Sequence, residues 1–332
     1  MSGNNKLLVF GSAGCEEIAA QIARRIGDDC LGEAIFSEFR SGQIKWTLPE
    51  SVRGAECWVI QFFNRARSDD LVRQFYEAKM LLRTLKDCHA QSWNLAMPLL
   101  PDTRQDQQWG REPYSLAQHA KELKELGVSE VITYDLHNPA TAALFDGSCT
   151  HLFTSFIFLP MLEAAFQSFD VVASTDTGSA KMAEWYSRRF PRCEVAMMYK
   201  GAKRGTMTRE IAEHKLAGDV SGKKILVVDE LCDSGGTLVS AVNFLIDEKG
   251  ASQVIIVIPH TTGTGDCQQK LAQLCERPEI LGYWTTDSVW QPAGFYESIP
   301  RATIVDLGPH LAEAIGNIHN HESVQGSYRL TP

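Results

Sequence analysis

Short apolar runs alternate with amphipathic segments along most of the chain. The apolar runs are rich in β-branched residues and end in turn residues, so they predict strands that are buried within a sheet. The amphipathic segments carry apolar residues three and four positions apart, which predicts helices packed on that sheet. The expected strands are residues 7–10, 34–39, 42–48, 57–62, 93–99, 131–134, 169–173, 195–198, 225–228, 254–259 and 280–285.

The expected helices fall between those strands. Ser115 is expected to cap the helix over residues 115–126, and Gly127 is expected to end it. Strands that alternate with helices favour an α/β fold built on mostly parallel sheets. The same order runs through both halves of the chain without a strict repeat, with a boundary expected near residues 146–150. The other predicted helices end at Arg25 and Phe190 or span residues 69–85, 238–246 and 310–318.

The predicted strand over residues 225–228 leads into the most informative candidate site. It ends in the adjacent acids Asp229 and Glu230, and residues 233–237 then open the next helix. Glycines let backbone N–H groups approach a phosphate closely, and a helix start favours its negative charge. Carboxylates beside such a cradle can accept hydrogen bonds from sugar hydroxyls or act through a metal. We therefore expect a sugar-phosphate site here rather than an ordinary strand-to-helix turn.

Composition and charge narrow the class of protein. The 332 residues are 44% hydrophobic and 22% charged, which is typical of a soluble globular protein of one or two domains. The net charge of −9 gives no general attraction to nucleic acid or to anionic membranes. No apolar run approaches the roughly 18 residues of a membrane span, and the N-terminus is not that of a signal peptide. Nine cysteines without a C-x-x-C pair favour free thiols in a reducing cytoplasm.

Other candidate residues follow predicted strands. His137 and Asp176 each stand at a strand end, where both can bind a metal; a solvated histidine and a helix-capping aspartate are the plain alternatives. Arg104 lies in a loop, where its guanidinium can bind phosphate or form an exposed ion pair. These residues are compatible with a phosphate or metal site, but the sequence pattern alone does not decide between such a site and the structural alternatives.

Residues 200–217 are polar and contain two glycines, which predicts a mobile loop. Such a loop can close cations over a reacting polyphosphate, although a solvated charged loop is the more common case. The candidate cations are Lys200, Lys203 and Arg204.

The order of these pieces resembles the ribose-phosphate pyrophosphokinases, also called PRPP synthetases, over nearly the whole chain. No single segment is decisive, but their joint order and spacing are highly specific. The segments that carry the resemblance are Glu50-Ser-Val-Arg-Gly54, Arg104-Gln-Asp106, Gly110-Arg-Glu-Pro113, Asp135-Leu-His137, Gly218-Asp-Val220, Val227-Val-Asp-Glu-Leu-Cys-Asp-Ser-Gly-Gly-Thr237, Leu311-Ala-Glu-Ala-Ile315 and His319-Asn-His-Glu-Ser-Val324.

The resemblance implies two phosphoribosyltransferase-like domains, each a mostly parallel sheet flanked by helices. It also implies a homo-oligomer built from dimers, usually a hexamer. The expected boundaries are residues 1–147 for the ATP side, 148–310 for the sugar-phosphate side and 311–332 for a helix and tail packed on the first domain. The implied reaction moves the β,γ-diphosphoryl group of ATP onto the C1 hydroxyl of ribose 5-phosphate, giving PRPP and AMP. The implied cofactor is Mg²⁺.

The resemblance also implies a role for each candidate residue. Lys200, with Arg204 or Lys203, would supply the cations of the catalytic loop. His137 and Asp176 would bind Mg²⁺ or its ligands. The ribose 5-phosphate would be held by Asp229, Glu230, Asp233, Ser234, Gly235, Gly236 and Thr237.

ATP would be held by another group of residues. Phe39 would stack on adenine from a neighbouring subunit, in a loop that also carries Ser41 and Gln43. Arg104, Gln105 and His137 would contact the same nucleotide.

The chain departs from the usual family pattern at some of these positions. Glu230 stands where the family usually has Asp, and residues 107–109 replace basic residues of its regulatory site. These departures motivate a close alternative, diphosphoryl transfer to a larger 5-phosphoribosyl acceptor such as ADP-ribose. Two further alternatives, taken in order, are a non-catalytic regulatory paralogue as the second and a phosphoribosyltransferase that consumes PRPP as the third. The retained candidate residues argue against the second, and the length and N-terminal segments argue against the third.

Overall fold

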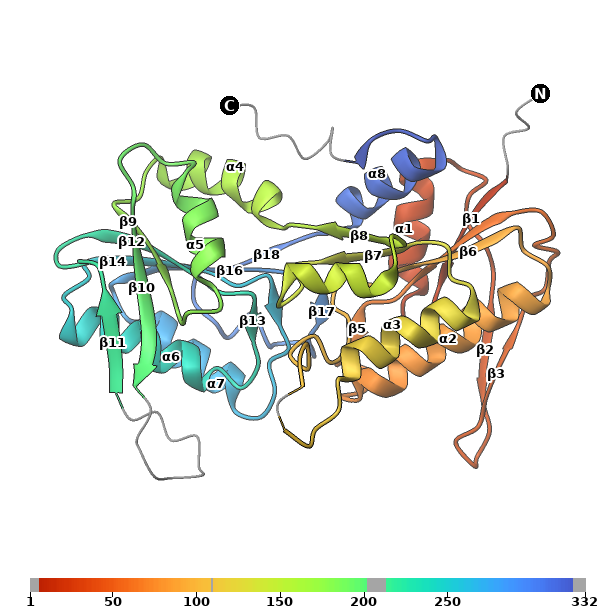
Figure 1. Cartoon of the computed structure of the whole chain (residues 1–332), viewed down its shortest axis with the longest axis horizontal. Coiled ribbons are helices and arrows are strands. Elements are labelled where there is room, and N and C mark those ends of the chain that lie inside the picture. Colours follow the sequence, from red (N-terminus) through yellow and green to blue (C-terminus); the bar gives the residue numbers. More distant parts are fainter. Residues whose placement is uncertain (1–5, 109, 202–212, 325–332) are drawn as a thin grey trace. The chain divides into compact units, whose positions relative to one another are not determined.

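The computed structural model describes residues 6–108, 110–201 and 213–324. The chain divides into two compact units (Figure 1). Unit 1 comprises residues 1–153, 288–290 and 306–332, and unit 2 comprises residues 154–287 and 291–305. The domain boundaries expected at residues 147 and 310 stay predictions.

A parallel sheet in the order β1–β4–β6–β7–β8 forms the centre of the described part of unit 1. Strands β1, β4 and β7 are mostly apolar because helices cover both faces of the sheet. Helix α1 packs against α8, and α2 lies beside α3 (Figure 1). The bounds are β1 (Leu7–Gly11), β4 (Glu56–Ile60), β6 (Ser92–Ala96), β7 (Val131–Tyr134), β8 (Cys149–Leu152), α1 (Glu16–Ile26), α2 (Leu71–Asp87), α3 (Ser115–Leu126), α8 (Gly308–His319) and the 3₁₀ helix η1 (Pro139–Phe145).

A separate hairpin of unit 1 is formed by β2 (Ile35–Glu38) and β3 (Ile44–Thr47), which pair antiparallel outside the parallel sheet. The side chain of Trp46 is buried and its Nε1 donates to the backbone oxygen of Glu77 in α2 over 3.0 Å. Arg73 of the same helix forms an ion pair of 3.0 Å with Glu38. These contacts hold the base of the hairpin on α2. A short bridge joins β5 (Phe63–Asn64) to β17 (Val289–Trp290).

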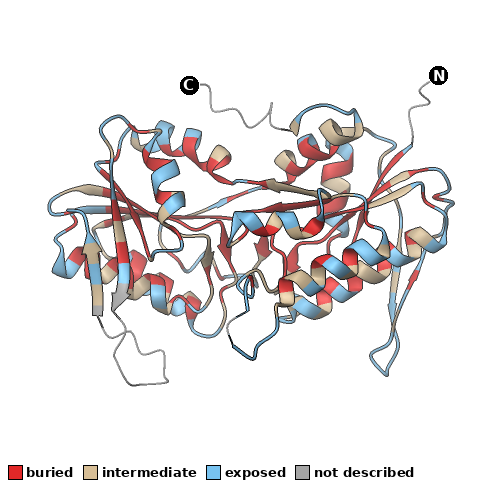
Figure 2. Cartoon of the chain, viewed as in Figure 1, coloured by how far each residue is buried: buried red, intermediate tan, exposed pale blue. Residues whose placement is uncertain are grey.

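Within the described residues, unit 2 contains a sheet in the order β11–β10–β9–β12–β14–β16–β18. Strands β10 and β11 pair antiparallel, and the other pairs are parallel. Buried residues concentrate in the strands and on the inner sides of the helices (Figure 2). The bounds are β9 (Val171–Ser174), β10 (Glu194–Gly201), β11 (Glu213–Ala217), β12 (Lys224–Val228), β14 (Gln253–Val257), β16 (Ile280–Thr286), β18 (Ala302–Val305), α4 (Ser155–Phe166), α5 (Ala180–Ser187), α6 (Gly236–Asn243), α7 (Cys267–Glu276) and the short β13 (Leu231–Cys232) and β15 (His260–Thr261).

The predicted α/β class is confirmed, but some local predictions are wrong. Ser115 is the first residue of α3 and not its cap, because Tyr114 holds the cap position. The segment expected to be a loop over residues 200–217 includes the end of β10 and all of β11, where antiparallel pairing stabilises polar residues as strands. Helix α4 was not predicted because it is apolar on nearly every side, so its sequence has no amphipathic period.

Two further observations concern the whole described chain. None of the helices over residues 6–108, 110–201 and 213–324 combines the length and hydropathy that crossing a bilayer requires. All nine cysteines are free thiols.

We predict that Gly32→Ala lowers the free energy of unfolding by about 1–3 kcal/mol, the usual cost of an overpacked core. A Cβ atom at Gly32 would lie 2.3 Å from Cζ of the buried Phe10 ring. The control is Gly316→Ala in α8, where a Cβ meets nothing within 4 Å. That change should raise the free energy of unfolding by about 0.5–1 kcal/mol through helix propensity. Equal effects of the two changes in urea denaturation would contradict the assigned contact.

Candidate active site

The acids of unit 2 lie where two neighbouring parallel strands end. β9 and β12 pair so that Ser174 lies opposite Val228, which places Thr175 and Asp229 at the same edge of the sheet. The buried hydroxyl of Thr175 donates to Oδ2 of Asp229. Oδ1 of Asp229 accepts from the backbone N–H of Glu230 over 3.0 Å. Both oxygens of this carboxylate are thus held by the sheet edge.

The surroundings raise the pKa of Asp229 well above its ordinary value. Burial is the largest cause, followed by the charge of Glu230 and the hydrogen bond with it, and Asp176 adds to the effect. The Thr175 hydroxyl acts in the opposite direction. Adjacent carboxylates that disfavour each other's charge suit a site that receives a cation or hydroxyl donors.

The residues present fit a cation only with help from a ligand. In the part of the chain that the structure describes, no group of three or more His, Cys, Asp or Glu side chains could hold a metal ion. Mg²⁺ is commonly bound by one or two carboxylates together with substrate phosphates and waters. Asp229 and Glu230 therefore suit a cation that arrives with a phosphorylated substrate.

Asp176 has a visible structural role. Its Oδ1 accepts from the backbone N–H groups of Gly178 over 2.8 Å and of Ser179 over 3.3 Å. These bonds form the turn that leads into α5. Ser179 holds the cap position of that helix, so Asp176 is not the helix cap that the alternative from the sequence expected. Its expected contact with Mg²⁺ stays a prediction.

The phosphate cradle is formed by the start of α6. Gly235 holds this position in the left-handed conformation, with φ of +74°, and a Cβ there would lie 3.3 Å from Sγ of Cys267. A helix leaves its first N–H groups without partners inside the helix. Because Gly235 has no side chain to cap them and the first turn of α6 contains no acid, these groups are suited to an anion.

A second loop supports the cradle from the end of β15. Oδ1 of Asp233 accepts from the hydroxyls of Thr262 over 3.0 Å and Thr264 over 2.6 Å. The backbone N–H of Thr264 also donates to the carbonyl oxygen of Asp233 over 3.0 Å. Asp233 thus ties the cradle to the neighbouring loop, and its carboxylate acts as a positioning group. Its predicted contact with the ligand stays a prediction.

Ser234 and Thr237 flank the glycines of the cradle. Both residues are exposed, and Gly236 begins the helix between them. Their hydroxyls are suited to hydrogen bonds with a phosphate seated at the helix start.

The candidate nucleotide residues of unit 1 also follow neighbouring parallel strands. Arg104 and Gln105 lie in the loop after β6, and His137 follows β7, its partner in the sheet. Arg104 and Gln105 are exposed, whereas His137 is half-buried. The loop is shaped by a hydrogen bond of 2.8 Å from the N–H of Gln105 to the oxygen of Asp102. The fold thus brings both loops to one edge of the sheet.

The turn that carries His137 is fixed by His151, a residue that the sequence did not indicate. Asp135 is buried and has a φ of +39°, an unusual value for a non-glycine residue. The N–H of Leu136 donates to Nε2 of His151 over 2.9 Å. His151 is therefore a positioning residue for this turn.

The predicted adenine-binding residues lie in the hairpin of unit 1, outside its parallel sheet. Phe39, Ser41 and Gln43 occupy the tip of the β2–β3 hairpin, and the side chain of Phe39 is 54% exposed. The backbone of Lys200 lies in β10 opposite His214 of β11. Lys203 and Arg204 lie outside the described residues.

Sequence reasoning missed Thr175, Thr262 and Thr264. A signal for the last two existed, because the segment Thr261-Thr-Gly-Thr-Gly-Asp266 follows a strand as the cradle does. Thr175 follows its strand in the same way. Its importance depends on the pairing of β9 with β12, which the sequence does not display.

We predict that Gly235→Ala weakens the binding of the expected ligand, ribose 5-phosphate, about tenfold, because a left-handed alanine costs about 1–2 kcal/mol and displaces the helix start. The matched control is Gly250→Ala, at a φ of +73°, where a Cβ atom would lie 3.5 Å from the hydroxyl oxygen of Ser221. The control should lower the free energy of unfolding by a similar amount but bind ribose 5-phosphate as tightly as the wild type does. Titration calorimetry with parallel urea denaturation checks this, and equal loss of binding in both variants would contradict a local role.

Comparison with known proteins agrees with this architecture. The family described as the N-terminal domain of ribose phosphate pyrophosphokinase matches residues 7–127, and the phosphoribosyl transferase domain matches residues 157–275. The chain is 28% identical over 323 residues to a ribose-phosphate pyrophosphokinase of Corynebacterium efficiens, covering 97% of this chain and 95% of that protein. It is 27% identical over 327 residues to that of Bacillus subtilis, covering 97% of each.

A solved structure extends the likeness to three dimensions. The phosphoribosylpyrophosphate synthetase of Mycobacterium smegmatis superposes with a TM-score of 0.84 at 27% identity, over 95% of this chain and 99% of that one. Each half of the chain therefore has a phosphoribosyltransferase-type fold. Taken with the carboxylates and the cradle at the sheet edge of unit 2, these matches show that the chain belongs to the ribose-phosphate pyrophosphokinase family of enzymes.

Proposed function

We propose that the protein transfers the β,γ-diphosphoryl group of ATP to the C1 hydroxyl of ribose 5-phosphate and releases PRPP and AMP. The observation that carries this proposal is the sheet edge of unit 2. There, Asp229 and Glu230 follow β12 directly, and the uncapped start of α6 follows a few residues later.

The sugar phosphate would bind along this edge. The 5-phosphate accepts hydrogen bonds from the first N–H groups of α6 and from the hydroxyls of Ser234 and Thr237. The carboxylates of Asp229 and Glu230 accept hydrogen bonds from the ring hydroxyls. Because Thr175 holds Asp229 in place, the sugar is oriented by a group that is itself fixed.

The nucleotide would bind through residues of unit 1. The guanidinium of Arg104 suits the phosphates of ATP, and Gln105 and His137 contact the same nucleotide. We further propose a homo-oligomer in which Phe39, with Ser41 and Gln43, contacts adenine bound to a neighbouring subunit. The 54% exposure of Phe39 at the hairpin tip supports this, because a large apolar side chain there is available to a partner.

Mg²⁺ is the proposed cofactor, and it would neutralise the charge of the ATP phosphates. His137 and Asp176 are the residues expected to bind Mg²⁺ ions or their ligands, and Asp229 and Glu230 would hold the ribose hydroxyls directly or through Mg²⁺. The described residues supply too few ligands to hold it alone, which fits an ion that enters with the nucleotide.

Catalysis would then be a matter of position and charge. The C1 oxygen forms a bond with the β-phosphorus, the bond from that phosphorus to the α,β-bridging oxygen breaks, and AMP leaves with the electron pair. The proton of the C1 hydroxyl is released to solvent. Lys200, with Arg204 or Lys203, would stabilise the charge on the transferring group.

We predict that the purified full-length protein forms AMP from Mg²⁺-ATP and ribose 5-phosphate, with a second product of the mass of PRPP. Removing Mg²⁺ with EDTA should abolish both products. Mass spectrometry with chromatography of AMP checks the outcome. Failure to form AMP with any phosphoribosyl acceptor would favour the regulatory alternative.

We also predict that Lys200→Ala lowers kcat about a thousandfold while the Kd for ATP changes less than about threefold, because a transition-state contact contributes little to ground-state binding. Lys215→Ala is the control, since Lys215 is exposed on the neighbouring strand β11. Steady-state kinetics gives kcat, and titration with ATP gives the Kd, so the two effects are measured separately. A loss of ATP affinity as large as the loss of kcat would contradict the proposed role.

A further inference from the structure

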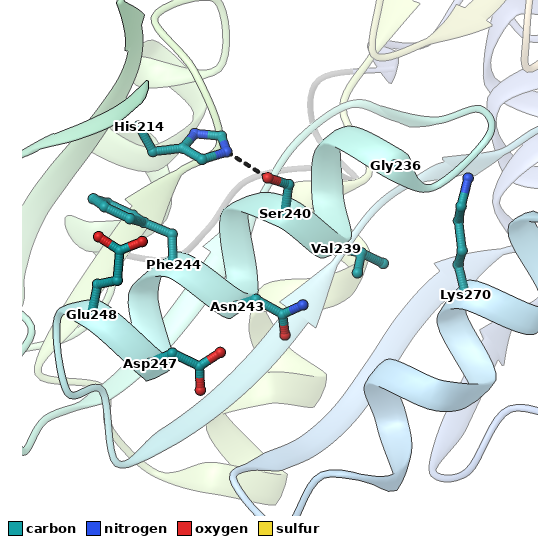
Figure 3. Close-up of a pocket in the computed structure, with 9 residues that line it drawn as sticks. All are labelled: His214, Gly236, Val239, Ser240, Asn243, Phe244, Asp247, Glu248 and Lys270. Carbon is teal, nitrogen blue, oxygen red and sulfur yellow. Dashed lines mark hydrogen bonds between the residues drawn. The ribbon is translucent and has the colours of Figure 1, made fainter. Parts of the chain in front are cut away.

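A pocket of 460 Å³ lies along the outer side of α6 and begins at the phosphate cradle. Gly236, the first residue of α6, lines one end of it, and the π-helical turn that continues α6, η2 (Phe244–Glu248), lines the other. Figure 3 shows Ser240 and Asn243 on the helix between these ends, with His214 of β11 and Lys270 of α7 on either side. The volume is within the usual range for a small-molecule site, about 300–1,000 Å³.

The end of the pocket beside the cradle carries a positive charge. Nζ of Lys270 lies 3.4 Å from the carbonyl oxygen of Ser234, so the cation stands next to the place proposed for the 5-phosphate. It is half-buried and forms an ion pair of 2.6 Å with the exposed Asp266. An ion pair this exposed contributes little, so Lys270 can turn to a second phosphate at small cost.

The middle and the far end of the pocket also carry polar side chains beside the apolar Val239 and Phe244. Nε2 of His214 and the hydroxyl of Ser240 share a hydrogen bond of 2.7 Å across the pocket wall. Asp247 and Glu248 line the far end, and Arg277 holds Asp247 with an ion pair of 2.7 Å. A carboxylate such as Asp247 or Glu248 can accept hydrogen bonds from neighbouring hydroxyls of a sugar, as ribose-binding acids do in other folds.

The order of charges along the pocket is therefore a cation near the cradle and carboxylates further away. Phe244 is only 6% exposed and packs against His214, so it forms the wall and not a stacking surface. Ribose 5-phosphate would occupy the cradle and leave the pocket to solvent. A ligand that continues beyond the 5-phosphate with a second phosphate and then a sugar would meet each group with its complement.

We propose that this pocket binds a nucleoside 5′-monophosphate group joined to the 5-phosphate in the cradle, so that the enzyme also accepts ADP-ribose and related phosphoribosyl acceptors. The inference rests on the proposed diphosphoryl transfer. The step is the same for both acceptors: the C1 oxygen bonds to the β-phosphorus of ATP, AMP leaves with the electron pair, and the hydroxyl proton goes to solvent. The product is the acceptor carrying a diphosphate at C1.

The test compares ribose 5-phosphate and ADP-ribose as acceptors with the full-length protein and Mg²⁺-ATP. AMP formation gives kcat/KM for each acceptor, and calorimetry gives the Kd of each in the absence of ATP. Lys270→Gln and Glu248→Gln should each lower the ratio of kcat/KM for ADP-ribose to that for ribose 5-phosphate about tenfold, since each removes a charged hydrogen-bond partner.

Matched controls remove the same charges elsewhere on unit 2. Lys181→Gln in α5 and Glu276→Gln in α7 change exposed residues that do not line the pocket, and they should leave the ratio unchanged. A fall in the ratio for the controls as large as for the pocket variants would overturn the proposal, because it would reflect net charge alone.

The acceptor results separate the two proposals. AMP from ribose 5-phosphate alone, with no tighter binding of ADP-ribose, overturns the pocket proposal and leaves the proposed function intact. AMP from neither acceptor overturns the proposed function. In that case, calorimetry still decides on the pocket: tighter binding of ADP-ribose that depends on Lys270 and Glu248 supports it, and equal binding of both compounds overturns it.

Discussion

The register between β9 and β12 is the constraint on which the candidate site of unit 2 depends. Because Ser174 lies opposite Val228, the next residue of each strand emerges at the same edge, and Thr175 can donate to Asp229. A shift of one residue would turn these side chains to the other face of the sheet. The parallel sheet thereby fixes a carboxylate that burial and neighbouring acids would otherwise discourage from carrying charge.

The same edge combines opposite electrostatic requirements within a few residues. Asp229 and Glu230 present negative charge, while the start of α6 presents partly positive N–H groups. A sugar phosphate has hydroxyl donors at one end and an anion at the other, so it matches this order. Asp233 lies between the two regions, and its Oδ1 accepts from the hydroxyls of Thr262 and Thr264, which ties the cradle to the neighbouring loop.

In unit 1 the candidate binding residues also follow neighbouring parallel strands, but they are suited to a nucleotide. Its loops after β6 and β7 bring an arginine, a glutamine and a histidine to one sheet edge. His151 and the positive φ of Asp135 fix the turn before His137. The buried Glu77, paired with Arg67 and Arg73, secures α2 beneath the hairpin that carries Phe39. His137 and Phe39 thus stand on a turn and a hairpin whose bases are held by side-chain contacts.

The sequence by itself determined the features that depend on neighbouring residues. Apolar runs such as residues 225–228 specified strands, and the glycines at 235 and 236 specified a tight helix start. The order and spacing of the motifs along the chain specified the family. The polar strand β11 and the apolar helix α4 were not recognised, since pairing and burial override local periodicity there. Only the tertiary structure decided that Thr175 holds Asp229, that Thr262 and Thr264 hold Asp233, and that a pocket runs from the cradle along α6. The physical reason is that these contacts join residues far apart in the chain, and sheet register and helix packing bring them together.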